Sequence, residues 1–160
     1  MTKAQIQAIY ERHADTVYRV CLLYFKSRAA DVEDAVQNTF IKLLHCEKAF
    51  ANAEHEKAWL IVVASNVCRN MLKSAWKRKV SLNEHAVLRQ TADEQYDDTV
   101  QCVMALPERY KASIYLHYYE GYKAREIAMM LGKREATVWG YLHKGRILLK
   151  EMLEEGERYE

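Results

Sequence analysis

The apolar residues of this chain recur every three or four positions, and this spacing predicts helices along nearly its whole length. The first segment to show the pattern is 4–27, where one face carries Ile6, Ile9, Val17, Val20, Cys21 and Tyr24. Only one proline and five glycines among 160 residues are available to interrupt such helices. The alternation of apolar and polar residues that is typical of β-strands is nearly absent. We therefore predict an all-α fold.

Two further helices are predicted before residue 82. Asp31 is expected to cap the first of them, with Glu33 and Asp34 in the first turn, where the helix dipole favours negative charge. Its apolar stripe consists of Val32, Val36, Phe40, Leu43 and Leu44. Residues 50–57 lose the pattern and are interpreted as a loop. A long helix follows at about 58–79, and its buried face is predicted to contain Leu60, Val63, Val67 and Met71.

The composition changes at residues 83–99, which are polar and acidic, with five acidic residues against Arg89 as the single arginine or lysine. Such a stretch predicts a linker between two small helical domains, at 1–82 and 100–160. In the second domain, Pro107 suits the first position of a helix, and Gly121 suits the residue after its end.

The strongest local signal is a helix-turn-helix within residues 122–146 of the second domain. A short helix at about 124–131 is followed by Gly132, which allows the positive φ of a sharp turn, and by a helix from about Glu135 to Glu155. The outer face of the second helix would meet the major groove of DNA with Arg134, Glu135, Thr137, Trp139, Tyr141, Lys144 and Arg146. A plain helical hairpin with solvated charges is the alternative, and the basic bias favours DNA binding.

A second signal is the absence of acidic residues from Lys57 to Leu82. Spacing by three and four places one set of polar side chains on a single face of the 58–79 helix, namely Asn66, Arg69, Lys73 and Lys77. Asn70 and Trp76 flank this face, and such side chains attract phosphates and bind or stack on bases. A solvated basic face with Trp76 half-buried remains the alternative.

A third signal is the acidic patch formed by Asp31, Glu33 and Asp34 together with Gln37. Helix capping explains part of it. Because three carboxylates in four residues exceed what capping needs, we also expect a protein partner with a basic surface.

No catalytic motif is present, and we expect no enzyme activity, no small-molecule substrate and no cofactor. Four cysteines, at positions 21, 46, 68 and 102, lack CxxC pairing and are interpreted as free, largely buried thiols. His45 adjoins Cys46 without a second ligand pair at zinc spacing, so no metal site is expected. Neither a membrane-spanning run nor a signal peptide is apparent, which predicts a cytoplasmic protein.

Several segments, taken in order, resemble the extracytoplasmic-function sigma factors of the sigma-70 family. Residues 31–40 (DVEDAVQNTF) and 58–66 (AWLIVVASN) resemble motifs of that family's domain two. Five further segments resemble the family's domain four, namely residues 106–110, 119–122 and 126–128, and Thr137-Val138 followed by Leu142-His143. The resemblance covers nearly the whole chain apart from the linker, and it implies a minimal member that has domains two and four alone.

The resemblance also implies roles for each surface. The acidic second helix would bind the clamp helices of the largest subunit of the RNA polymerase core through Asp31, Glu33, Asp34, Gln37 and Phe40. The third helix and the loop before it would engage and open the −10 promoter element through Asn52, Asn66, Arg69, Asn70, Lys73, Trp76 and Lys77. The helix-turn-helix would read the −35 element with the outer face described above. The polymerase flap and an anti-sigma factor are the further partners that the family implies.

Some positions depart from the family pattern. Arg134 stands where a serine cap is frequent, and the loop 50–57 carries Glu54 and Glu56 where positive or small residues are common. Trp139 and Tyr141 cannot make the bidentate guanine contact that arginine makes, which predicts few direct hydrogen bonds to the −35 bases.

Two glycines lie inside the predicted recognition helix. Gly140 and Gly145 each cost about 0.8–1.0 kcal/mol relative to alanine in a helix interior. We interpret them as positions where the backbone approaches DNA or the polymerase flap closely.

Two other functions compete with that of a sigma factor. One is a two-domain helix-turn-helix regulator that binds operators without joining polymerase. The other is an adaptor whose acidic and basic faces bind only proteins. Initiation by core polymerase separates the first from a sigma factor, and DNA binding at low salt separates the second from both.

Overall fold

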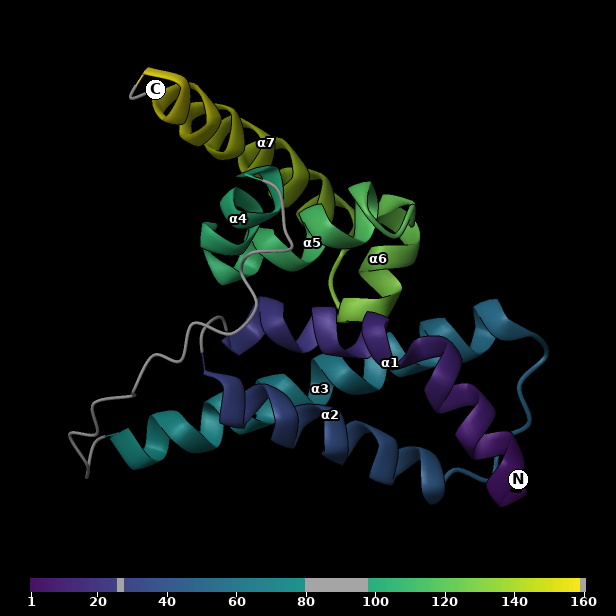
Figure 1. Cartoon of the computed structure of the whole chain (residues 1–160). Helices are drawn as coiled ribbons and strands as arrows, with labels where there is room; N and C mark the ends of the chain where they lie inside the picture. The colour runs from purple at the N-terminus through teal and green to yellow at the C-terminus, as the bar shows by residue number, and fades with distance from the viewer. Residues whose placement is uncertain (26–27, 80–97, 159–160) are drawn as a thin grey trace. The chain divides into compact units, whose positions relative to one another are not determined.

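The computed structural model describes residues 1–25, 28–79 and 98–158, without the side chains of residues 76–79, 98–100 and 157–158. Every regular element in this part of the chain is an α-helix, which confirms the predicted all-α fold. The helices are α1 (Lys3–Phe25), α2 (Ala29–Leu44), α3 (Ala53–Lys79), α4 (Asp98–Ala105), α5 (Glu108–Tyr118), α6 (Ala124–Leu131) and α7 (Glu135–Arg158). They form two compact units, α1–α3 and α4–α7 (Figure 1). Most of the predicted linker lies outside the described residues, so its limits stay a prediction.

In the first unit, α1, α2 and α3 each pack against the other two (Figure 1). The core is apolar and draws on all three helices, including Val17, Val20, Cys21, Val32, Ala35, Leu43, Leu60, Ile61, Ala64, Val67 and Cys68. Leu44 was expected in the core, but it is 58% exposed, because Leu43 fills the inward position at the end of α2. Val63 and Met71 are half-buried, because the inward face of α3 is centred on Ile61, Ala64 and Cys68.

Two predicted helix starts in this unit are wrong. Helix α2 begins at Ala29, with Arg28 in the N-cap position and no side-chain cap. Asp31 therefore lies inside the first turn rather than at the cap, with Oδ2 3.9 Å from Arg28 Nη1. Glu33 and Asp34 were expected in the first turn, but they lie beyond it because the helix starts earlier.

Helix α3 begins at Ala53, five residues before the expected start, so residues 53–57 are helical rather than loop. The cap is Asn52, whose Oδ1 accepts a hydrogen bond from the His55 backbone N–H at 2.9 Å. Glu54 and Glu56 follow in the first turn, where the dipole favours carboxylates.

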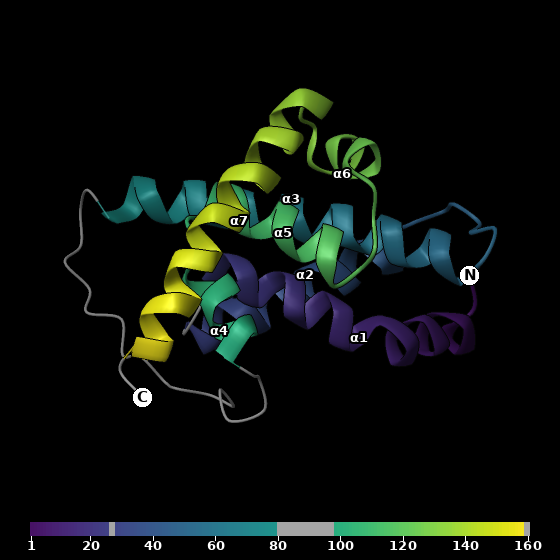
Figure 2. The ribbon, with the colours of Figure 1, turned by 90° about the horizontal axis from the view of Figure 1, so that it is seen from above.

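The second unit is organised around α7. Helices α4, α5 and α6 all contact it, and Figure 2 shows α6 beside the first turns of α7 and α4 beside later ones. Pro107 occupies the N-cap position of α5, one residue before the predicted place. The C-cap of α5 is Tyr119, so Gly121, with φ +78°, lies two residues beyond the cap rather than at the predicted cap position. Gly132 has φ +65° at the C-cap of α6, so both glycines permit turns that other residues adopt rarely.

Gly145 lies where α7 packs closely against α5, and not where the sequence analysis expected DNA or the polymerase flap. A Cβ at this position would lie 2.8 Å from Ile114 Cγ1, so α7 and α5 approach each other closely inside the unit. The close approach is therefore to a neighbouring helix, and the interpretation that DNA or the polymerase flap requires this glycine is wrong. A Cβ at Gly140 would meet no atom within 4 Å.

Candidate nucleic-acid and partner interfaces

Helices α6 and α7 form the predicted helix-turn-helix. Ile127, Ala128 and Leu131 of α6 are buried, as are Val138 and Leu142 of α7, so the two helices pack through apolar faces. The Lys133 backbone N–H donates to the Ala128 carbonyl at 2.9 Å and closes the turn around Gly132. The geometry of a tight turn between two packed helices leaves the outer side of α7 free for a major groove.

The outer side of α7 carries most of the residues expected to meet DNA. Glu135, Lys144 and Arg146 are exposed, and Trp139 is 52% exposed. Arg134, which immediately precedes α7, is exposed too.

Two other members of the predicted set are less accessible than Trp139. Thr137 is half-buried, and so is Tyr141, whose ring meets Tyr110 edge-on at 5.7 Å between centroids. Trp139 is therefore the more exposed of the two aromatic side chains in the predicted set, and its ring can meet a base edge or a thymine methyl group.

Basic residues near the turn extend this surface. Arg125 on α6 and Lys133 in the turn are both exposed, although the sequence analysis did not select them. Their position beside the turn could have identified them in the sequence, because cations that flank a helix-turn-helix can neutralise phosphates without reading bases.

Helix α3 exposes part of the polar set that was expected to bind DNA. Asn66, Asn70 and Lys73 are exposed. Arg69 is half-buried and extends along the helix, donating from Nη2 to Asn66 Oδ1 at 2.6 Å and from Nε to the Ser65 carbonyl at 3.4 Å. The expected contributions of Trp76 and Lys77 fall on side chains outside the described residues.

The α2–α3 loop, residues 45–52, is held against the first turns of α3. The Phe50 ring meets His55 at 5.3 Å and Trp59 at 5.5 Å between centroids, edge-on in both cases. The Ala51 backbone N–H donates to His55 Nδ1 at 3.1 Å. Because Asn52 uses its Oδ1 in the cap, its amide NH2 group is the part that can face a base.

The acidic patch lies on the first half of α2. Glu33, Asp34 and Gln37 are exposed, whereas Asp31 is half-buried. Phe40 is also half-buried, with its ring edge-on to Tyr10 at 4.8 Å between centroids.

Two apolar side chains on the second half of α2 extend this surface. Ile41 is 48% exposed and Leu44 is 58% exposed, and neither was selected as a site residue. Helix α2 thus offers exposed carboxylates followed by exposed aliphatic groups, which is the chemistry of a protein-binding surface.

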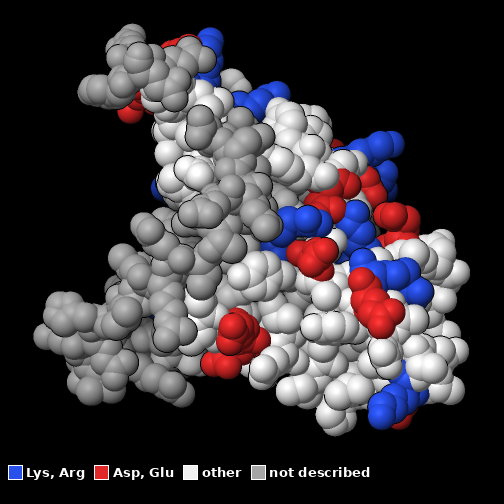
Figure 3. All heavy atoms as spheres, in the orientation of Figure 1, with Lys and Arg blue, Asp and Glu red and all other residues white. Residues whose placement is uncertain are grey.

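The surface seen in Figure 3 has no large region of a single charge sign. Acidic and basic side chains are intermixed on the visible part of the surface in Figure 3, in keeping with a formal net charge of +2. No group of three or more potential metal ligands occurs among the described residues. None of the helices in the described ranges is long and apolar enough to cross a membrane.

Comparisons with known proteins match both units. The family model of sigma-70 region 2 matches residues 9–78, and that of sigma-70 region 4 matches residues 96–149. A relative from Mycobacterium tuberculosis, the ECF RNA polymerase sigma factor SigL, is 29% identical over 95% of this chain and 90% of its own length. RNA polymerase sigma factor SigV of Bacillus subtilis is 28% identical over 95% of this chain and 93% of its own length.

Solved structures share the fold. The sigma factor RpoE from Bartonella quintana, in complex with the anti-sigma factor NepR, matches with a TM-score of 0.71 and 19% identity over 96% of this chain and 98% of that one. CnrH, in complex with the cytosolic domain of CnrY, matches with a TM-score of 0.63 and 19% identity over 96% of this chain and 90% of that one.

Proposed function

This chain belongs to the extracytoplasmic-function group of the sigma-70 family, and we propose that its two units read different elements of one promoter. As a sigma factor, it binds the RNA polymerase core and directs promoter-specific transcription initiation. The α4–α7 unit would read the −35 element, and the α1–α3 unit would recognise and open the −10 element.

The proposal rests on one observation: each of the two matched segments exposes polar or aromatic side chains that can contact DNA. Asn66, Asn70 and Lys73 are exposed on α3, within the segment that matches region 2. Trp139 and Lys144 are exposed on the outer side of α7, within the segment that matches region 4. Amide and aromatic groups suit unpaired bases, and a helix-turn-helix suits an intact major groove.

Contact with polymerase is assigned to a different surface. The exposed carboxylates of Glu33 and Asp34 and the apolar Ile41 and Leu44 lie on α2, apart from the polar set on α3. We assign α2 to the clamp helices of the largest polymerase subunit, because both attraction to a basic partner and apolar burial are available there.

An anti-sigma factor is the second protein partner that we propose. The fold is shared with the sigma factor RpoE, whose structure was solved with the anti-sigma factor NepR bound, and with CnrH, whose structure was solved with the cytosolic domain of CnrY bound. A tagged copy of this chain, purified from its native host without an inducing signal, should recover a protein other than polymerase. Recovery of polymerase alone would contradict this assignment.

Site-specific crosslinking tests the division of the promoter. A photo-reactive amino acid in place of Lys73 should crosslink to the −10 region of a promoter bound by holoenzyme, and one in place of Trp139 should crosslink to the −35 region. A matched probe in place of the exposed Glu11 on α1, outside both proposed surfaces, should crosslink to neither element. Crosslinks in the opposite order, or equal crosslinks from all three positions, would refute the proposal.

A further inference from the structure

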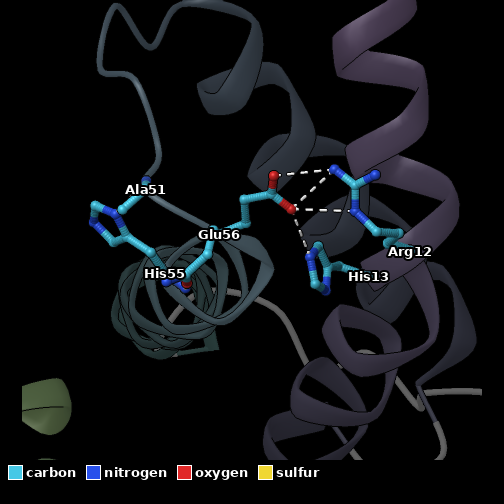
Figure 4. Close-up of polar contacts among 6 residues, drawn as sticks. Arg12, His13, Ala51, His55 and Glu56 are labelled. Carbon is cyan, nitrogen blue, oxygen red and sulfur yellow. Dashed lines mark hydrogen bonds and ion pairs between the residues drawn. The ribbon is translucent and has the colours of Figure 1, made fainter.

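Glu56 carries a nearly buried carboxylate near the start of α3, and this carboxylate binds two side chains of α1 (Figure 4). Arg12 Nη2 donates to Glu56 Oε1 at 3.0 Å and to Oε2 at 3.1 Å. Arg12 Nε lies 3.3 Å from Oε2, and His13 Nε2 lies 3.0 Å from the same oxygen. These contacts join residues more than forty positions apart in the sequence.

The cluster of Arg12, His13 and Glu56 fixes the orientation of the first turn of α3 relative to α1. Glu56 is 9% exposed and His13 is 6% exposed, so both polar groups would be costly without partners. Charge-assisted hydrogen bonds from a guanidinium are directional. The first turn of α3 is therefore held at a defined angle to α1, beyond what their apolar contacts require.

The same turn of α3 holds the end of the α2–α3 loop. The Glu56 backbone N–H donates to the Asn52 carbonyl at 3.1 Å, and the His55 backbone N–H donates to Asn52 Oδ1 at 2.9 Å. Figure 4 shows the Glu56 side chain pointing toward α1, while His55 and Ala51 lie away from Arg12 and His13. One helical turn thus connects α1 to Asn52, which is a residue proposed to meet the −10 element.

We propose that the cluster of Arg12, His13 and Glu56 is a positioning device for the α2–α3 loop, and that it sets how strictly the loop discriminates bases of the −10 element. This inference rests on the proposed function of the loop. It also gives a reason for Glu56, an acidic residue in a segment that should approach DNA: its carboxylate faces α1 rather than the nucleic acid.

The test measures base discrimination by the full chain with RNA polymerase core. The extent of open-complex formation is measured on a promoter and on copies of that promoter with single base substitutions in the −10 element. Glu56→Gln keeps the shape of the side chain but removes the charge that binds Arg12. It should reduce the preference for the correct base by about tenfold, the order of one mismatched base, and leave core binding unchanged.

Glu54→Gln is the matched control. It removes a carboxylate from the same first turn, and Glu54 is exposed, so discrimination should stay at the wild-type level. The double variant Arg12→Gln/Glu56→Gln should discriminate as well as Glu56→Gln alone, because both changes remove one interaction. Equal discrimination by Glu56→Gln and Glu54→Gln would overturn the proposal.

Two further variants separate positioning from general stability. Val20→Ala removes buried volume from α1 away from the cluster, and it should lower the melting temperature without lowering discrimination. If Val20→Ala lowers discrimination as much as Glu56→Gln does, the effect is structural and the proposal is wrong.

If Glu56→Gln does not fold, the Arg12→Gln variant tests the proposal instead. The Arg12 side chain is 47% exposed, so its replacement should destabilise the protein less. A folded Arg12→Gln variant should show reduced discrimination, and an unchanged preference would refute the proposal. A wild-type chain that ignores −10 substitutions would instead contradict the proposed function of the loop itself.

Discussion

Replacing Gly145 by alanine should destabilise the α4–α7 unit even though alanine is the better helix former. The new Cβ would lie 2.8 Å from Ile114 Cγ1, 2.9 Å from Ile114 Cδ1 and 3.4 Å from Tyr110 Cβ. Ile114 is 1% exposed, so its side chain would have to shift within the core of the unit. Overpacking of this kind costs about 1–3 kcal/mol, whereas the change from glycine to alanine returns about 0.8–1.0 kcal/mol of helix propensity.

Gly140→Ala is the matched control on the same helix. A Cβ there meets nothing within 4 Å, so this variant should be stabilised by about 0.8–1.0 kcal/mol. The two single substitutions should therefore differ by about 1–3 kcal/mol, which is the cost of the contact with Ile114.

Hydrogen exchange measures this difference within the full chain. Peptides from α5 and α7 should exchange faster in Gly145→Ala than in Gly140→Ala, and peptides from α1–α3 serve as an internal reference. Ile114→Ala should partly suppress the effect of Gly145→Ala, because it removes the two atoms nearest to the new Cβ. Equal protection in the two glycine variants would refute the close helix crossing.

Three further predictions concern the interfaces. Glu33→Arg combined with Asp34→Arg should weaken capture of polymerase core while circular dichroism stays unchanged, because both side chains are exposed and lie beyond the first turn of α2, where the helix dipole has little effect; undiminished capture would show that α2 does not contact polymerase. Lys73→Ala should lower the log–log salt slope of promoter binding by about 0.7–0.9, and an unchanged slope would place this ammonium away from phosphates. Trp139→Ala should weaken promoter binding with little change in stability, whereas the buried Leu142→Ala should cost about 2–5 kcal/mol of stability; a large loss of stability in Trp139→Ala would show that this side chain serves the core.

Local signals predicted the helix-turn-helix well. Gly132 adopts the expected positive φ, α6 ends at Leu131 and α7 begins at Glu135. Each of these features depends on residues only a few positions apart, so the sequence pattern contains the needed information. The same reasoning placed Asn66 and Lys73 on one exposed side of α3, but it also expected Arg69 to be exposed there, and Arg69 is half-buried.

Features that depend on distant partners were not predictable in this way. The start of α3 combines the Asn52 cap with a Glu56 carboxylate whose partner, Arg12, lies 44 residues earlier. Gly145 makes sense only once α5 is seen to cross α7 at Ile114. Periodicity shows which side of a helix is apolar, but it does not show which neighbour that side meets.

Run-off transcription with purified RNA polymerase core on genomic fragments tests the central claim most directly. The chain should cause core enzyme to initiate at a limited set of sites that share two spaced sequence elements, and core alone should not initiate there. The Glu33→Arg/Asp34→Arg variant should lose these transcripts although its DNA-binding residues are intact. DNA binding without any chain-dependent transcript would contradict the account and would instead match a helix-turn-helix regulator that does not join polymerase.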